Sequence, residues 1–242
     1  MRKFGLIGKQ LGHSFSKAFF TEKFQQEGIS AVYENIEIPE IAEIKSILAS
    51  GSFAGLNVTI PYKEVVIPYL DELSDEAKAI GAVNVIAFRD GKTIGYNTDA
   101  FGFHQSIKPF LTNRHERALI LGTGGASKAV AYVFESIGLD VIYASRVPQG
   151  PKQFAYSDIN QHMLNACKVI VHCTPVGTFP NVNESVPFPF EFLTDEHLVI
   201  DLIYNPAQTH FLAQSAAAGA TTLNGLSMLK EQANKAWEIW NV

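Results

Sequence analysis

A short polar cluster in this chain combines residue types suited to proton transfer. Residues 54–58 are predicted to form a strand, and Pro61 prevents its continuation as a central strand. Asn57 and Thr59 therefore lie near the carboxyl end of the strand, the edge where open α/β sheets bind ligands. Lys63 follows closely, and a partly desolvated lysine is a candidate acid or base. The alternative is an ordinary strand exit with a solvated surface lysine.

A strand, a glycine loop and a helix follow one another from residue 117 onward. The predicted strand 117–121 leads into Gly122 and Gly124, and a helix is predicted over 126–136. Gly122 permits a tight turn, Gly124 lets backbone amides approach a pyrophosphate, and the helix start presents free N–H groups. Ser127 stands where the usual pattern has its third glycine. The context predicts dinucleotide binding; the alternative is a glycine-rich turn without a ligand.

The end of the next predicted strand indicates which dinucleotide. A site for NAD needs an acidic residue about 20 residues after the glycine loop, to bind the ribose 2′-hydroxyl. The strand instead ends at Ser145 and Arg146, and a guanidinium pairs bidentately with phosphate oxygens. This favours NADP over NAD. The alternative is an exposed arginine after a strand.

Other motifs carry less chemistry. Residues 12–16 (GHSFS) resemble a nucleophile elbow, but the last glycine is missing, so Ser14 and Ser16 are interpreted as holding a polar ligand or capping the following helix. The seven histidines lack paired metal-ligand spacing, so no metal site is predicted. A phosphate-cradling G-x-x-x-x-G-K-[ST] loop is also absent, which argues against a kinase or an ATPase.

Composition narrows the class of protein. The 242 residues include 19 basic and 24 acidic side chains without a basic run, so nucleic acid is not an expected partner. Apolar stretches are of strand length, which predicts no membrane-spanning helix, and the first residues lack the apolar core of a signal peptide. Cys167 and Cys173 fit neither a disulfide framework nor a zinc motif. A reducing cytoplasm is the expected compartment.

Strand and helix patterns alternate along the chain, which predicts an α/β fold. The first hundred residues alternate strands and helices and then add a hairpin around Asp90 and Gly91. The second half repeats the alternation with buried, parallel-type strands at 169–172 and 198–202. A last helix is predicted from Met228 to Trp240. Residues 97–102 are the expected crossing between two domains, because a new βαβ unit starts soon after them.

Eight segments in fixed order resemble the shikimate dehydrogenase family. They are residues 12–16 (GHSFS), 57–63 (NVTIPYK), 81–84 (GAVN), 95–102 (GYNTDAFG), 122–127 (GTGGAS), 174–177 (TPVG), 201–206 (DLIYNP) and 225–233 (GLSMLKEQA). Each segment is modest alone, but together they span nearly the whole chain. Val147 departs from the family, which commonly has threonine after the arginine, and the stretch between Ser145 and Lys168 is short for the family.

The resemblance implies a fold, a reaction and a pair of domains. The reaction is the reversible NADP-dependent reduction of 3-dehydroshikimate to shikimate in aromatic amino-acid (chorismate) biosynthesis. The fold is a two-domain α/β enzyme. A mostly parallel substrate domain, residues 1–100 with 224–242, is closed by the C-terminal helix and faces a Rossmann dinucleotide-binding domain, residues 101–223.

The resemblance also implies roles for individual residues. Lys63 and Asp99 would form the catalytic pair. The substrate-binding residues would be Ser14, Ser16, Asn57, Thr59, Asn84, Asp99, Tyr204 and Gln232. The cofactor-binding residues would be Gly122, Gly124, Gly125, Ala126, Ser127, Ser145, Arg146, Thr174, Gly225 and Met228.

Two other functions stay open at this point. One is a quinate/shikimate dehydrogenase of broader specificity, and the other is a catalytically silent NADP-binding regulatory module. The presence of Lys63 and Asp99 argues against the silent module. The expected partner is a small-molecule substrate, and the protein is expected to be a monomer or a homodimer.

Overall fold

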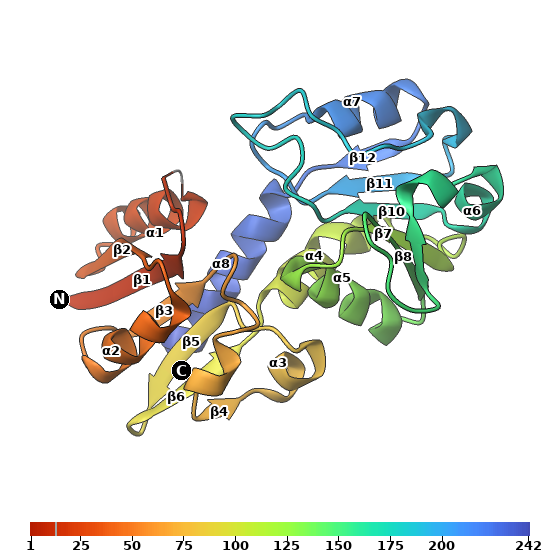
Figure 1. Cartoon of the computed structure of the whole chain (residues 1–242). Coiled ribbons are helices and arrows are strands. Elements are labelled where there is room, and N and C mark those ends of the chain that lie inside the picture. The colour runs from red at the N-terminus through yellow and green to blue at the C-terminus, as the bar shows by residue number, and fades with distance from the viewer. Residues whose placement is uncertain (13) are drawn as a thin grey trace. The chain divides into compact units, whose positions relative to one another are not determined.

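The computed structural model describes residues 1–12 and 14–242, which form two compact units. Unit 1 comprises Met1–Gly102 together with Glu231–Val242, and unit 2 comprises Phe103–Lys230. The chain therefore enters unit 2 once and returns to unit 1 through the last helix, α8 (Leu226–Trp240), within which the second boundary falls (Figure 1). The division predicted from sequence, with its breaks near residues 100 and 224, stays a prediction about domain function.

Unit 1 is built on a mixed six-stranded sheet in the order β2-β1-β3-β5-β6-β4. Strand β1 pairs in parallel with β2 and β3, whereas β5 pairs antiparallel with both β3 and β6. The strands are β1 Arg2–Gly8, β2 Ala31–Glu37, β3 Gly55–Val58, β4 Glu72–Leu73, β5 Val85–Arg89 and β6 Lys92–Tyr96. The helices are α1 Phe15–Gln26, α2 Ile44–Ala49 and α3 Asp75–Ile80, with α4 Asp99–Ile107 starting in this unit and ending in unit 2.

Strand alternation gives this sheet two apolar faces, and each face has its own core. On β5, Val85 and Ala87 belong to a cluster formed with α1 and α8, whereas Ile86 belongs to one formed with α2 and α3. Trp240 of α8 anchors this helix to the face of the sheet that α1 also covers. Its Nε1 donates to the Ile86 carbonyl at 3.1 Å, and its ring covers Gly55 so closely that a Cβ there would lie 2.4 Å from the indole.

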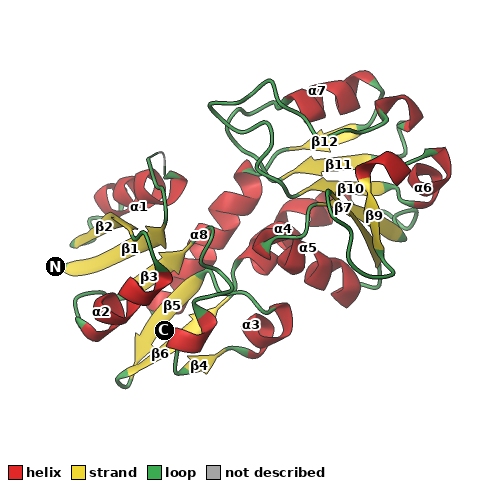
Figure 2. Ribbon diagram, in the orientation of Figure 1, coloured by secondary structure: helices red, strands yellow, loops and turns green. Residues whose placement is uncertain are grey.

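Unit 2 contains a parallel sheet in the order β12-β11-β10-β7-β8-β9, which is the strand order of a Rossmann fold. Figure 2 shows helices on both sides of this sheet. The strands are β7 Arg117–Leu121, β8 Asp140–Ser145, β9 Gln153–Ala155, β10 Val169–His172, β11 Leu198–Asp201 and β12 Thr221–Leu223. The helices are α5 Gly125–Ser136, α6 Gln161–Ala166 and α7 His210–Ala217.

The order of the strands reverses between β7 and β10, which are neighbours in the sheet. In open α/β sheets, ligands bind at the carboxyl ends of the strands at this switch point. The glycine loop follows β7, and Thr174 comes shortly after β10. The topology thus brings the two segments to the same edge of the sheet.

The two-domain α/β fold expected from sequence is confirmed, and so are its strongest local elements. Strands β5 and β6 form the predicted hairpin, with positive φ at Asp90 (51°) and Gly91 (76°). Residues 97–102 are not a bare linker, because α4 begins at Asp99. Helix α4 was missed because its residues, 99–107, lie directly after a strand and across the expected crossing. No helix of the described residues is long and apolar enough to cross a membrane.

Candidate active site

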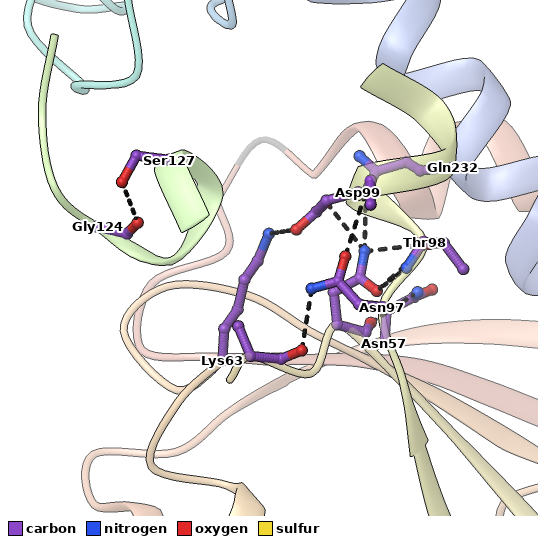
Figure 3. A network of polar contacts seen from close by, with 11 residues as sticks. Asn57, Lys63, Asn97, Thr98, Asp99, Gly124, Ser127 and Gln232 are labelled. Atoms are coloured by element: carbon purple, nitrogen blue, oxygen red, sulfur yellow. Dashed lines mark hydrogen bonds and ion pairs between the residues drawn. The ribbon is translucent and has the colours of Figure 1, made fainter. Parts of the chain in front are cut away.

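The predicted catalytic pair is formed in unit 1. The Nζ atom of Lys63 lies 2.7 Å from Oδ2 of Asp99, although the two residues come from different segments (Figure 3). Asp99 begins α4 and is 1% exposed, whereas the Lys63 side chain keeps 15% of its surface accessible. The Lys63 carbonyl accepts from the Val83 amide at 2.7 Å, which holds the lysine backbone beside the start of β5. A buried carboxylate needs such a partner, because desolvation without one costs several kcal/mol.

Asn84 organises the polar groups around Asp99. Its Nδ2 lies 3.0 Å from Oδ1 of Asp99, 3.1 Å from the Thr98 hydroxyl and 3.0 Å from Oε1 of Gln232. Its Oδ1 accepts from the Thr98 amide at 2.7 Å, which sets the orientation of the side-chain amide. Asn84 is 3% exposed. Gln232 comes from α8, so the last helix supplies one member of this network.

Asn57 lies at the carboxyl half of β3 and is oriented by a residue that sequence reasoning missed. The Tyr33 hydroxyl donates to Oδ1 of Asn57 at 2.6 Å, and Nδ2 of Asn57 donates to the Asn84 carbonyl at 3.2 Å. Tyr33 is 4% exposed, and its ring stacks on Phe20 with centroids 4.8 Å apart. The Tyr33 pKa lies well above its ordinary value, because burial raises it by more than the hydrogen bond with the Ser16 side chain lowers it.

A signal for Tyr33 exists in the sequence. Residues 32–38 alternate apolar and polar side chains, and Tyr33 lies among them as an aromatic residue with a polar end. A buried tyrosine hydroxyl usually finds a hydrogen-bond partner. The pattern therefore predicts that Tyr33 has a polar partner, but it does not indicate that the partner is Asn57.

Ser14, Ser16 and Thr59 lie near the carboxyl ends of β1 and β3. The Ser14 hydroxyl accepts from the Lys17 amide at 3.2 Å and caps α1, so one of the two alternatives for this serine is realised. Ser16 lies in the first turn of α1 and contacts Tyr33. The Thr59 amide donates to the Ile7 carbonyl at 2.9 Å, which keeps Thr59 beside β1. Binding of the substrate by these three residues stays a prediction, and His13 of the same motif lies outside the described residues.

The glycine loop of unit 2 provides backbone groups rather than side chains. Gly122 has φ +106°, a conformation that favours glycine, and Gly124 is the N-cap of α5. The first turn of a helix leaves its N–H groups without intrahelical acceptors, and Gly124 has no side chain to cap them. A Cβ at Gly124 would meet nothing within 4 Å, so the approach to Gly125 and Ala126 is open. This geometry fits the pyrophosphate of a dinucleotide.

Ser127 is turned inward. It is 1% exposed, and its hydroxyl donates to the Gly124 carbonyl at 2.6 Å (Figure 3). This bond stabilises the shape of the loop, and direct contact between Ser127 and a cofactor stays a prediction.

The end of β8 carries the residues predicted to select the cofactor. Arg146 is exposed and forms no ion pair with any described residue. Lys152 is the next basic residue, but its amine lies 3.0 Å from the Asp140 carboxylate. Oγ of Ser145 is buried without a hydrogen-bond partner among the described residues. Arg146 is thus the basic side chain at this strand end that no carboxylate holds.

The remaining predicted cofactor residues and Tyr204 also belong to unit 2. Thr174 is half-buried after β10, and Tyr204 is half-buried after β11. Gly225 approaches another backbone segment so closely that a Cβ would lie 2.0 Å from the Leu202 carbonyl oxygen. Met228 is 6% exposed in α8. The roles of these four residues in ligand binding stay predictions.

Within the described part of the chain, no group of three His, Cys, Asp or Glu side chains could hold a metal ion.

A Rossmann unit with an open glycine loop, together with a lysine paired with a buried carboxylate, is typical of nucleotide-dependent dehydrogenases. Comparisons with known proteins narrow this class. Residues 6–86 match the model of the shikimate dehydrogenase substrate binding domain. The chain is 38% identical to a shikimate dehydrogenase (NADP(+)) of Syntrophomonas wolfei, over 97% of this chain and 88% of that protein.

Solved structures agree. One is a shikimate 5-dehydrogenase of Thermus thermophilus in complex with NADP(H) and shikimate. It is 32% identical with a TM-score of 0.86, and the match covers 99% of this chain and 93% of that one. Shikimate dehydrogenase 1 of Peptoclostridium difficile is 38% identical with a TM-score of 0.87, covering 100% and 92% of the two chains. The chain belongs to the shikimate dehydrogenase family.

Proposed function

We propose that this protein catalyses the reversible NADPH-dependent reduction of 3-dehydroshikimate to shikimate, a step of chorismate biosynthesis. The observation that carries the proposal is the 2.7 Å ion pair between Lys63 and the buried Asp99. Relatives that span nearly the whole chain are named shikimate dehydrogenase (NADP(+)), and the Thermus thermophilus structure holds NADP(H) and shikimate. The protein acts in the cytoplasm as a monomer or a homodimer.

The two units have separate tasks in this proposal. Unit 1 binds the substrate. Ser14 and Ser16 hold its carboxylate. Its ring hydroxyls are held by Asn57, Thr59, Asn84, Asp99 and Gln232. Unit 2 binds NADP through the amides of the glycine loop, and Arg146 pairs with the 2′-phosphate. Further contacts with the cofactor come from Ser145, Thr174, Gly225 and Met228. Gly124 and the first turn of α5 support the pyrophosphate site.

Reduction of a ketone requires a hydride at carbon and a proton at oxygen, and NADPH supplies the hydride when bound. The Lys63 ammonium donates the proton to the developing alkoxide and stabilises its negative charge. Asp99 holds the ammonium in place through Oδ2. Oδ1 of Asp99 accepts from Asn84, which favours the carboxylate orientation that directs Oδ2 to the lysine. In the oxidation of shikimate, the same lysine accepts the hydroxyl proton.

An assay of NADPH absorbance with 3-dehydroshikimate tests the proposal. We expect turnover with NADPH and 3-dehydroshikimate, and reduction of NADP by shikimate in the reverse direction. Quinate in the reverse assay separates the proposed activity from the broader one, and NADH in the forward assay measures the cofactor preference. If the folded protein binds NADP but turns over neither substrate, the catalytic assignment of Lys63 and Asp99 is wrong.

A further inference from the structure

A buried histidine links the carboxyl ends of two neighbouring strands in unit 2. His172 ends β10 and Asp201 ends β11, and the two residues are direct partners in the parallel register. Nδ1 of His172 lies 3.1 Å from Oδ1 of Asp201, and Nε2 lies 2.5 Å from the Thr174 hydroxyl. Both His172 and Asp201 are fully buried. The proposed reaction uses neither of them.

The surrounding bonds determine which atom carries each proton. The Thr209 hydroxyl accepts from the Leu212 amide, so its own proton goes to Oδ2 of Asp201 at 2.6 Å. The Asp201 carboxylate only accepts, so Nδ1 of His172 carries a proton and donates to it. With a single proton on the ring, Nε2 is the acceptor, and the Thr174 hydroxyl donates to it.

This bond orients the Thr174 side chain against the glycine loop. Threonine is branched at Cβ, so fixing its hydroxyl on His172 also fixes the direction of its methyl group. That methyl group packs on Gly122, since a Cβ added at Gly122 would lie 2.9 Å from Cγ2 of Thr174. Gly122 has φ +106° and begins the turn that leads to the amides of α5. The Thr174 rotamer therefore forms one wall of the turn.

We propose that His172 is a positioning residue for the cofactor site. Held by Asp201, it selects the Thr174 rotamer that supports the Gly122 turn and so sets the affinity of unit 2 for NADP. The inference rests on the proposed function in one respect, namely that NADP binds at the glycine loop.

Substitution of His172 by asparagine separates its two bonds. The asparagine amide occupies the place of Nδ1 and still donates to Asp201, but it has no group at the place of Nε2. We expect His172→Asn to weaken NADP binding by about three- to tenfold, the scale of one net hydrogen bond. The KM for shikimate should stay within about twofold. Thr174→Val removes the same bond from the other side, together with the bond that the Thr174 hydroxyl accepts from the Val176 amide, and should weaken NADP binding by at least the factor expected for His172→Asn.

The double variant tests whether the two residues act through one bond. If they do, His172→Asn combined with Thr174→Val binds NADP about as weakly as Thr174→Val alone, because the bond is already lost. Additive losses in the double variant would overturn the proposal, since each residue would then act independently. Wild-type affinity for NADP in folded His172→Asn would overturn it as well.

His197 provides a matched control in the same unit. It is 1% exposed, its Nδ1 accepts from the Thr194 amide, and its Nε2 donates to the Leu164 carbonyl. His197→Asn therefore removes a buried, fully bonded imidazole away from the glycine loop. It should lower the melting temperature and leave NADP affinity unchanged. An equal loss of NADP affinity in this variant would mean that any weakening of unit 2 has the same effect, which contradicts a positioning role for His172.

Two further readouts keep the inference separable from folding and from the proposed function. Nitrogen NMR of isotope-labelled histidine in the wild-type protein should show His172 with a protonated Nδ1 and an unprotonated Nε2. A protonated Nε2 would contradict the assigned bond to Thr174 even if every variant failed to fold. Wild-type protein that binds no NADP by calorimetry would instead reject the proposed function.

Discussion

The candidate binding sites of the two units are built from different parts of the chain, side chains in unit 1 and backbone amides in unit 2. In unit 1 the candidate site consists of side chains that hold one another: Lys63 on Asp99, Asp99 on Asn84, and Asn84 on Gln232. In unit 2 the glycine loop offers backbone amides, and its main requirement is the absence of side chains at Gly122 and Gly124. Loss of one side chain should therefore be severe in unit 1 and graded in unit 2.

The largest expected effect is at Lys63. Lys63→Met should lower kcat by about two to four orders of magnitude, because it removes both the proton donor and the charge at the alkoxide. The KM for substrate should change less, since the lost interaction is strongest in the transition state. Steady-state kinetics with 3-dehydroshikimate checks this. A folded variant with more than about a third of wild-type kcat would rule out Lys63 as the acid.

Folding of the Lys63 variant needs its own control. The substitution leaves Asp99 buried without its ion pair, which costs about 3 kcal/mol or more. Asp99→Asn added to Lys63→Met removes that charge and should restore much of the stability while activity stays lost. Lys92→Met breaks the exposed pair with Glu72 in the same unit and should keep near wild-type kcat.

The next largest effect concerns cofactor choice in unit 2. Arg146→Ala should weaken NADP binding by about ten- to a hundredfold, the scale of charge-assisted hydrogen bonds to a phosphate. NAD lacks the 2′-phosphate, so its affinity should barely change. Titration of both nucleotides by calorimetry gives the ratio of NADP affinity to NAD affinity.

Lys152→Ala is the matched comparison for Arg146. Because its amine is paired with Asp140, the variant should reduce NADP affinity by less than about threefold. An unchanged ratio of NADP to NAD affinity in Arg146→Ala would remove this arginine from the site, and a large loss in Lys152→Ala would transfer the role to the lysine.

A smaller effect is expected at Tyr33. Tyr33→Phe removes the donor that orients Asn57, so the KM for shikimate should rise by about three- to tenfold with little change in NADP affinity. Tyr62→Phe is the control, because the Tyr62 hydroxyl donates to the Ile38 carbonyl and both rings are 4% exposed. The two variants should lose comparable stability in thermal melts. Equal KM values for the two would mean that Tyr33 acts only in packing.

The smallest effect is a difference between the two units in how their stability against unfolding depends on pH. Burial lowers the pKa of His115 and His197, both in unit 2, below their ordinary value. The unfolded state therefore binds more protons in mildly acid solution, and stability is lost as pH falls below about 6.5. The described residues of unit 1 include no histidine. Between about pH 7.5 and 5.5, the amide protection factor, which is corrected for the slower intrinsic exchange at lower pH, should fall more in β10 than in β1.

His197→Asn should reduce the pH dependence of the stability of unit 2. Both tryptophans, Trp237 and Trp240, belong to unit 1, so their fluorescence follows that unit during unfolding. A pH dependence of equal size in both units would assign it to groups other than these two histidines.

Local signals in the sequence were sufficient for most strands, for the hairpin and for the glycine loop, whereas Asn84, Asp99 and Gln232 of the candidate site came from the family resemblance. The period of apolar residues predicted the buried strands, the Asp90–Gly91 pair predicted the hairpin, and the strand–loop–helix pattern predicted the switch-point loop. These features act over a few neighbouring residues, so their physical basis is contained in short segments. The short helices α6 and α7 were missed because strands and loops flank them closely.

Tertiary structure decided which polar groups meet. Lys63 and Asp99 are 36 residues apart, and Asn84 and Gln232 are 148 apart, so their pairing depends on the strand order of unit 1 and on the return of α8. Packing also turned Tyr33 toward Asn57. By itself, the sequence determined the fold class and the chemical groups available. Apart from the Lys63–Asp99 pair, which the family resemblance implied, the folded chain decided their partners, because a hydrogen bond depends on distance and angle, and long-range packing sets both.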